Sequence, residues 1–190
     1  MNNKEEALIL VDIQRDFLPG GSLPVPNGDK IISPVNKLIK KCIKKGVPII
    51  ATRDWHPENH CSFDINGGSW PVHCVQNTIG AKFAESLDLP NSMIVISKGD
   101  SPLKEAYSAF EGTGLFETLK DLGVKIIYVA GLATDYCVKE TVLDGLKFGL
   151  RAFVIEDCIK GVSEDTTQEA ISRMEQAGAI FIKSQDIFKE

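Results

Sequence analysis

The stretch Leu122-Gly123-Val124-Lys125-Ile126-Ile127-Tyr128-Val129-Ala130 decides the fold of this chain. A glycine directly after a helical segment ends the helix, and the apolar run that follows has the length and the β-branched content of a buried strand. The same order of helix, glycine and strand recurs at Gly46, Gly149 and Gly178. Repetition of this unit predicts an α/β protein with a parallel sheet.

Continuous apolar runs are typical of strands that helices cover on both faces, and the chain has six of them. The predicted strands are 7–11, 47–51, 93–97, 126–130, 152–155 and 179–182. The predicted helices are 31–45, 114–122, 135–148 and 166–176. We therefore expect one doubly wound, Rossmann-like domain over residues 1–190, with three α/β/α layers around a mainly parallel six-stranded sheet.

The composition is that of an ordinary globular protein, with 43% apolar residues, 25% charged residues and a net charge of −5. There is no long basic stripe, so nucleic acid is not an expected partner. Residues 1–6 are polar and no apolar run could span a bilayer, which predicts a cytoplasmic protein without membrane attachment. The composition leaves open whether the chain forms a homo-oligomer.

The cysteines argue against a disulfide framework and against a structural zinc site, because their number is odd and they form no C-x-x-C pair. At least one free thiol is expected. The five cysteines are Cys42, Cys61, Cys74, Cys137 and Cys158.

Asp54-Trp55-His56 follows a predicted strand and begins a predicted metal site. Residues i and i+2 of an extended backbone point to the same side, so Asp54 and His56 can bind one ion together. Pro57 favours the extended form of His56, and His73 offers a third ligand. A carboxylate with two imidazoles suits zinc, iron or manganese. The alternative is that these are loop histidines bound to backbone or solvent.

Three more reactive side chains stand where predicted strands end, at the edge of the sheet where α/β proteins bind ligands. Asp12 closes an apolar run, although it could also cap a turn. Lys98 closes another run, where a solvated surface lysine is the alternative. Cys137 follows the third run, at the start of a predicted helix.

The position of Cys137 is typical of a nucleophile, because a thiol in a first helical turn lies near backbone N–H groups that favour the thiolate. Thr134 or Asp135 is the expected N-cap of this helix. A buried structural cysteine is the alternative.

Six motifs resemble those of the nicotinamidase (pyrazinamidase-type) branch of the isochorismatase-like cysteine hydrolase family. They keep the family's order, and the resemblance covers roughly residues 7 to 183. The motifs are Val11-Asp12-Ile13-Gln14-Arg15-Asp16-Phe17, Asp54-Trp55-His56, Trp70-Pro71-Val72-His73-Cys74-Val75, Lys98-Gly99, Ala106-Tyr107-Ser108-Ala109-Phe110-Glu111-Gly112 and Gly131-Leu132-Ala133-Thr134-Asp135-Tyr136-Cys137-Val138.

The resemblance implies a catalytic triad of Asp12, Lys98 and Cys137. Asp12 would take the thiol proton and later give it to ammonia, while Lys98 would hold the carboxylate. Cys137 would attack the amide carbon of nicotinamide and form a thioester that water opens to nicotinate, a step of NAD salvage. Pyrazinamide is a second expected substrate. In similar enzymes the peptide before Ala133 is cis, and the N–H groups of Ala133 and Cys137 face the oxyanion.

The resemblance also implies one divalent ion, with zinc favoured over iron or manganese, held by Asp54, His56 and His73 to orient the ring nitrogen of the substrate. His60 would be a further ligand or a neighbour of the ion's water. Another small-amide hydrolase of the same family is the alternative enzyme, and a non-catalytic zinc-binding or redox-sensing module is the alternative from another class. Four aromatic residues would line the ring pocket, unless they only pack in the core: Phe17, Trp70, Tyr107 and Tyr136.

Overall fold

The computed structural model describes residues 5–188 and has a six-stranded sheet in the order β3-β2-β1-β4-β5-β6. Every pair of neighbouring strands is parallel, which confirms the predicted parallel sheet. All six predicted strands are present. They are β1 (Glu6–Val11), β2 (Ile49–Asp54), β3 (Ile94–Lys98), β4 (Ile126–Leu132), β5 (Arg151–Lys160) and β6 (Ile180–Ile182).

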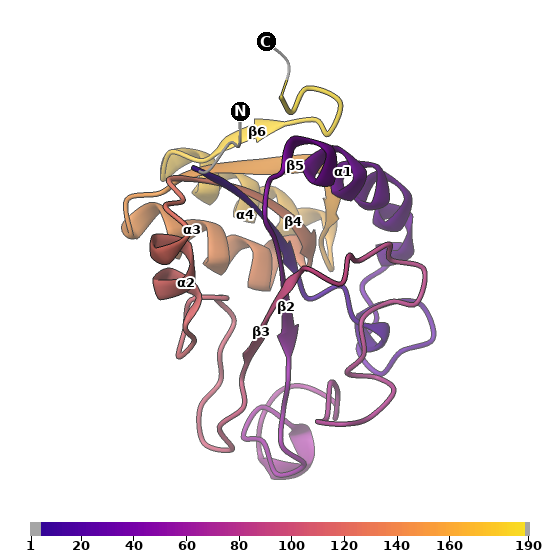
Figure 1. Cartoon of the computed structure of the whole chain (residues 1–190). Helices are drawn as coiled ribbons and strands as arrows, with labels where there is room; N and C mark the ends of the chain where they lie inside the picture. Colours follow the sequence, from indigo (N-terminus) through magenta and orange to yellow (C-terminus); the bar gives the residue numbers. More distant parts are fainter. Residues whose placement is uncertain (1–4, 189–190) are drawn as a thin grey trace.

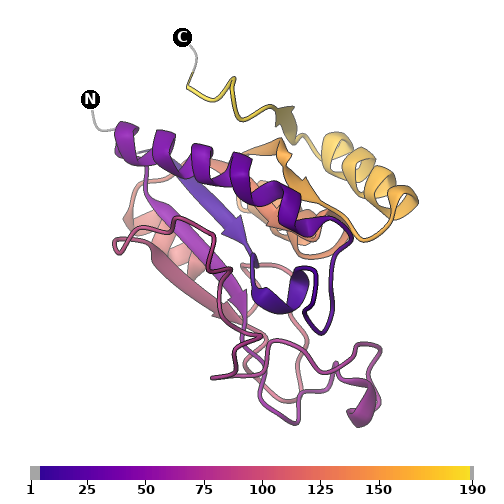
Figure 2. The same cartoon turned by 90° about the vertical axis from the view of Figure 1, so that its right-hand side faces the viewer.

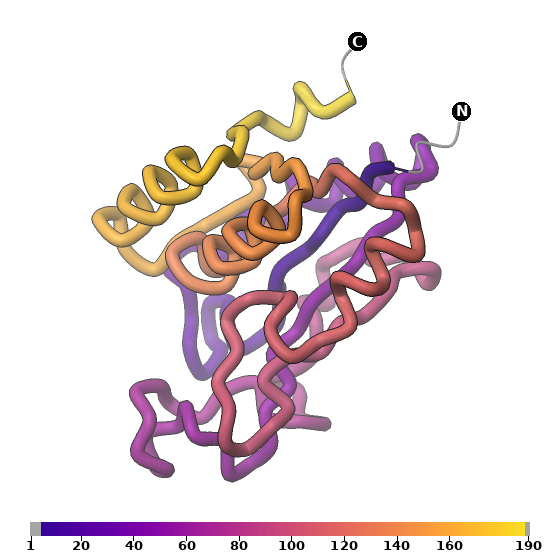
Figure 3. Tube along the Cα trace, turned by 90° about the vertical axis from the view of Figure 1, so that its left-hand side faces the viewer, coloured from indigo at the N-terminus to yellow at the C-terminus, as the bar shows by residue number. Residues whose placement is uncertain are grey.

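Helices cover both faces of the sheet, as Figures 2 and 3 show from opposite sides. Leu8 and Leu10 of β1 pack in a cluster with the apolar side of α1, whereas Ile9 and Val11 point the other way, toward the other three helices. This alternation confirms the three α/β/α layers. The helices are α1 (Ile32–Lys45), α2 (Leu115–Asp121), α3 (Lys139–Lys147) and α4 (Glu164–Gln176).

The helix ends follow the predicted glycines, because Gly46, Gly123, Gly149 and Gly178 all have positive φ just past a helix. The start of the helix that carries Cys137 differs from the prediction. A π-helical turn over Thr134–Val138 precedes α3, and its N-cap is Ala133.

The predicted cap by Thr134 or Asp135 is therefore wrong. The carboxylate of Asp135 instead accepts hydrogen bonds from Val162 N and from Thr166 Oγ1, and so ties the turn to the start of α4.

The strand order reverses between β1 and β4, and a crevice opens there at the carboxyl ends of the strands. Two long connections leave those ends in Figure 1: residues 55–93 between β2 and β3, and residues 99–114 between β3 and α2. The first contains no α-helix. Within residues 5–188, no helix combines the length and the apolar character needed to span a membrane.

Candidate active site

Four adjacent strands deliver the reactive side chains to one place. Asp54 and Lys98 are the last residues of β2 and β3, Asp12 follows β1, and Cys137 lies in the turn after β4. Lys98 Nζ lies 2.9 Å from Asp12 Oδ2 and 3.5 Å from Cys137 Sγ, and it forms an ion pair with Asp54. The structure thus brings together all three residues of the expected triad. Lys98 is buried, with 1% exposure, and is not a surface lysine.

Asp12 is held in one orientation by Thr52. Its φ of 48° is in the left-handed region, and Thr52 Oγ1 donates a 2.6 Å hydrogen bond to its Oδ1 atom. Oδ2 receives no hydroxyl and instead pairs with the ammonium of Lys98 at 2.9 Å, on the side of Cys137. Oδ2 is therefore the oxygen that can accept a proton.

Burial determines the protonation of Cys137 and Asp12 in the free protein. Burial raises the pKa of Cys137 well above its ordinary value, and the charge of Asp12 adds to the effect while Lys98 opposes it. Burial raises the pKa of Asp12 as well, against the charge of Lys98. The expected thiolate at the helix start is therefore not the form favoured in the free protein, and the nucleophile has to lose its proton during the reaction.

In the Lys98 and Asp54 pair, by contrast, the pKa shifts favour the ionised form of both groups. Burial lowers the pKa of Lys98, but the charges of Asp12 and Asp54 outweigh it and raise this pKa well above its ordinary value. Burial raises the pKa of Asp54, but the charge of Lys98 and the hydrogen bond with His56 lower it overall. Both groups are therefore ionised at neutral pH.

Asp54, His56 and His73 offer a ligand set for a divalent cation. One ligand atom from each lies within 4.8 Å of the other two, and all three side chains are buried. His56 Nδ1 lies 2.8 Å from Gly99 O, and His73 Nδ1 lies 2.7 Å from Pro71 O. Since a carbonyl oxygen only accepts, each Nδ1 carries a proton, which leaves Nε2 of each ring as the atom that could bind an ion, the arrangement found in metal-ligating histidines.

His60 lies outside this group of three. Its Nε2 atom is 3.1 Å from Lys104 O and must donate to that carbonyl, while Nδ1 accepts hydrogen bonds from Ser62. Both ring nitrogens are therefore engaged, and neither has a lone pair to offer an ion. The ring of His60 stacks on that of His56 at a centroid distance of 4.1 Å and so helps to hold His56 in place.

Gln14 fixes the backbone of Asp54. Its side-chain amide accepts a 2.8 Å hydrogen bond from Asp54 N and donates one of 2.8 Å to Asp54 O, and a third bond of 2.9 Å runs to Ala81 O. Asp16 makes a similar connection, because its carboxylate accepts from Cys74 N at 2.7 Å and from Ser22 N at 3.2 Å. These two buried residues join the candidate ligand group to the chain around Asp12 and Phe17.

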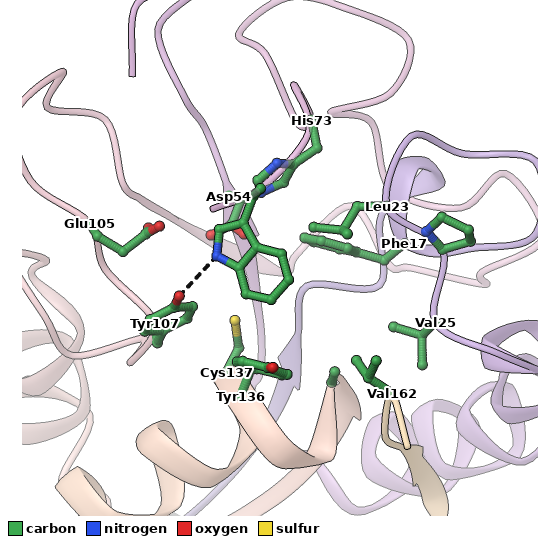
Figure 4. A pocket seen from close by; sticks show the side chains of 13 residues that line it. Phe17, Leu23, Val25, Asp54, His73, Glu105, Tyr107, Tyr136, Cys137 and Val162 are labelled. Atoms are coloured by element: carbon green, nitrogen blue, oxygen red, sulfur yellow. Dashed lines mark hydrogen bonds between the residues drawn. The ribbon is translucent and has the colours of Figure 1, made fainter. Parts of the chain in front are cut away.

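A pocket opens above Cys137 and is shown in Figure 4. Trp70 Nε1 donates a 2.9 Å hydrogen bond to Tyr107 Oη, drawn as the dashed line, and this bond closes one wall. Ala133 lines the pocket, and the Leu132–Ala133 peptide is cis, as the resemblance implies. All four aromatic residues expected at the ring pocket line it: Phe17, Trp70, Tyr107 and Tyr136.

The remaining pocket residues and the supporting residues were not predicted. Glu105 had a signal in the sequence, because it directly precedes the motif that carries Tyr107. Thr52 had a similar one, two positions before Asp54 on a strand. The apolar wall had no local signal, since its residues come from separate segments. It consists of Leu23, Pro24, Val25 and Val162.

The comparisons with known proteins agree on the family of this chain. The model of the isochorismatase domain matches residues 6–186. The chain is 41% identical to a nicotinamidase of Escherichia coli K12 over 91% of each sequence. It is 38% identical to a nicotinamidase/pyrazinamidase of Mycobacterium tuberculosis, over 94% of this chain and 98% of that one.

A solved structure of similar shape is the pyrazinamidase of Pyrococcus horikoshii in complex with zinc. It is 53% identical to this chain, with a TM-score of 0.92 over 94% of this chain and 99% of that one. The domain match covers nearly the whole chain, and both curated relatives exceed 30% identity over more than nine-tenths of their length. The chain therefore belongs to the isochorismatase family.

Proposed function

We propose that this protein is a nicotinamidase, which hydrolyses nicotinamide to nicotinate and ammonia through a thioester on Cys137, and that it depends on one divalent ion. The observation that carries the proposal is the convergence of Asp12, Lys98 and Cys137 with the Asp54, His56 and His73 group on one pocket. Names of the relatives support the substrate class, since they are nicotinamidases and pyrazinamidases.

The first half of the reaction forms a thioester. The Cys137 Sγ–H proton passes to Asp12 Oδ2 while sulfur attacks the carboxamide carbon, and the carbonyl oxygen becomes an oxyanion that the N–H groups of Ala133 and Cys137 stabilise. The C–N bond then breaks, and Asp12 returns the proton to the leaving ammonia. Lys98 keeps the Asp12 carboxylate in place throughout.

The second half regenerates the thiol. Asp12 accepts a proton from water, the hydroxide attacks the thioester carbon, and the C–S bond breaks. Nicotinate leaves, and the proton returns to sulfur. Asp12 Oδ2 suits this alternating use, because the hydroxyl of Thr52 binds the other carboxylate oxygen and does not have to be displaced.

Metal ligation is assigned to Asp54, His56 and His73, whose donor set fits zinc and also suits iron or manganese. When bound, the ion would supply a Lewis-acidic anchor for the ring nitrogen of the substrate. The aromatic side chains Trp70, Tyr107 and Tyr136 would hold the ring flat against this anchor. Pyrazinamide presents a nitrogen in the corresponding place, so we include it as a substrate.

Further expectations are part of the proposal: a single domain over the chain, a role in NAD salvage and a cytoplasmic location. All five cysteines are free, as a reducing compartment would require. Oligomeric state stays open.

Ammonia release from nicotinamide tests the proposal. Purified protein is assayed after chelation, and again after the addition of zinc, iron or manganese. We expect turnover only with metal, and much faster turnover of nicotinamide than of carbamoyl compounds. No ammonia from metal-loaded protein would reject the function, and full activity after complete chelation would reject the metal dependence alone.

A further inference from the structure

Glu105 is a charged residue of the pocket wall that the reaction leaves unused. Its side chain is partly buried and points into the pocket beside Tyr107 in Figure 4. The Oε1 atom accepts a 2.9 Å hydrogen bond from Ala106 N. Within residues 5–188, Glu105 has no ion-pair partner, so its negative charge is not neutralised by the protein.

The carboxylate of Glu105 faces the histidines. One of its oxygens lies within 4.8 Å of ring nitrogens of both His56 and His60. His60 cannot bind an ion itself, because both of its nitrogens are engaged. His56 is one of the proposed ligands. Glu105 therefore lies beside the three-ligand group, on the side where His60 stacks on His56.

The charges around the proposed metal site explain why an anion at the position of Glu105 would matter. The proposed ligand set contains one carboxylate, Asp54, and the ammonium of Lys98 already pairs with it. Lys98 also pairs with Asp12, and His56 and His73 bind metal as neutral rings, so these groups together present one net negative charge to a dication. A second anion nearby balances the two charges of the ion and favours the ion over bulk water.

We propose that Glu105 is a positioning residue of the metal centre, which stabilises the divalent ion by its charge and accepts hydrogen bonds from water bound to that ion. The inference rests on the proposed metal site at Asp54, His56 and His73. Glu105 acts from outside the ligand set, because its oxygen groups with His56 and His60 rather than with the three ligands together. Neighbours of this kind change metal affinity about 10- to 100-fold.

Zinc affinity of Glu105→Gln tests the inference. This substitution removes the charge but keeps an oxygen that can accept from Ala106 N. The matched control is Glu111→Gln, which removes a charge from the same connection where Glu111 pairs with Lys104 at 3.6 Å, away from the pocket. Zinc dissociation constants are measured by competition with a chromogenic chelator, and melting of the zinc-free proteins checks the fold. Glu105→Ala is a second variant.

We expect Glu105→Gln and Glu105→Ala to weaken zinc binding about 10- to 100-fold, while Glu111→Gln binds like the wild type and all zinc-free proteins melt alike. Wild-type affinity in Glu105→Gln, or an equal loss in Glu111→Gln, would overturn the role of Glu105 and leave the proposed function intact. Absence of zinc binding in the wild type would instead overturn the metal site and this inference with it.

Discussion

At the scale of single residues, the site depends on the two oxygen atoms of Asp12 having different partners. Thr52 donates to Oδ1 at 2.6 Å, and Oδ2 forms the ion pair with Lys98 at 2.9 Å. The proposed base is thus selected by a neighbour 40 positions away in the sequence. This division of the carboxylate leads to two predictions.

Thr52→Val, which keeps the shape and removes the hydroxyl, should lower both turnover and stability. Asp12 Oδ1 would lose its buried donor, at a cost of about 1–3 kcal/mol in the free energy of unfolding. Urea unfolding and kcat for nicotinamide measure the two effects. Thr118→Val serves as control, because the hydroxyl of Thr118 bonds only to a carbonyl of its own helix start. Equal stability of the two variants would contradict this role of Thr52.

The pH dependence of kcat/KM should reflect the raised pKa of Asp12. The reaction requires the ionised carboxylate, so activity is lost as pH falls through this pKa. Because burial raises it, the acid limb should lie above the ordinary Asp value of 3.8. Thr52→Val should move the acid limb to still higher pH, since the hydroxyl of Thr52 favours the ionised form of Asp12. A limb at or below 3.8 would show that another group controls the reaction.

At the scale of elements, the end of β3 controls the orientation of a proposed ligand on the neighbouring segment. Gly99 follows Lys98 with a φ of +62°, and its carbonyl accepts the hydrogen bond from His56 Nδ1. A Cβ atom at Gly99 would lie 2.5 Å from His56 Cε1. The glycine is therefore required by the backbone and by the imidazole together.

Gly99→Ala should displace His56 and weaken zinc binding. The control is Gly112→Ala in the same connection, where φ is +69° and a Cβ would meet nothing within 4 Å. Both variants lose about 1–2 kcal/mol to backbone strain, so only a steric effect on His56 separates them. Zinc titration of the two variants measures the difference, and similar affinities would rule out the steric effect.

The elements also show what local sequence could predict. All six strands and the four helices follow from apolar runs and glycine stops, within a few residues. β5 continues to Lys160 although exposed Glu156 and Asp157 interrupt its apolar run, because pairing with β4 resumes after a bulge. The π-helical turn over Thr134–Val138 was missed for a similar reason, since tertiary bonds of Asp135 define it.

At the scale of the whole molecule, the sheet order places residues from distant parts of the chain at one crevice. The triad and the three ligands were found from residue types at strand ends, and the family motifs assigned their roles. Supporting residues were missed, because Gln14 and Thr52 act through bonds that span 40 positions. No local pattern encodes such pairs, which exist only once β1 and β2 lie side by side.

Zinc should stabilise the whole fold, because its proposed ligands come from β2 and from the long connection 55–93. At a zinc concentration 100 times the dissociation constant, the free energy of unfolding rises by about 2.7 kcal/mol. For a chain of this size, that corresponds to a rise in Tm of about 5–10 °C. Thermal melts with and without zinc measure it, and His73→Ala should abolish the shift. A shift that persists in His73→Ala would point to a different metal site.

The most direct test of the central claim is the turnover of nicotinamide by zinc-loaded Cys137→Ala, with hydroxylamine added to wild-type reactions to intercept the thioester. We predict that Cys137→Ala releases no ammonia yet binds zinc like the wild type, and that the wild type forms the hydroxamate of nicotinate at the expense of nicotinate. Continued turnover in Cys137→Ala would contradict the account, and so would loss of its zinc.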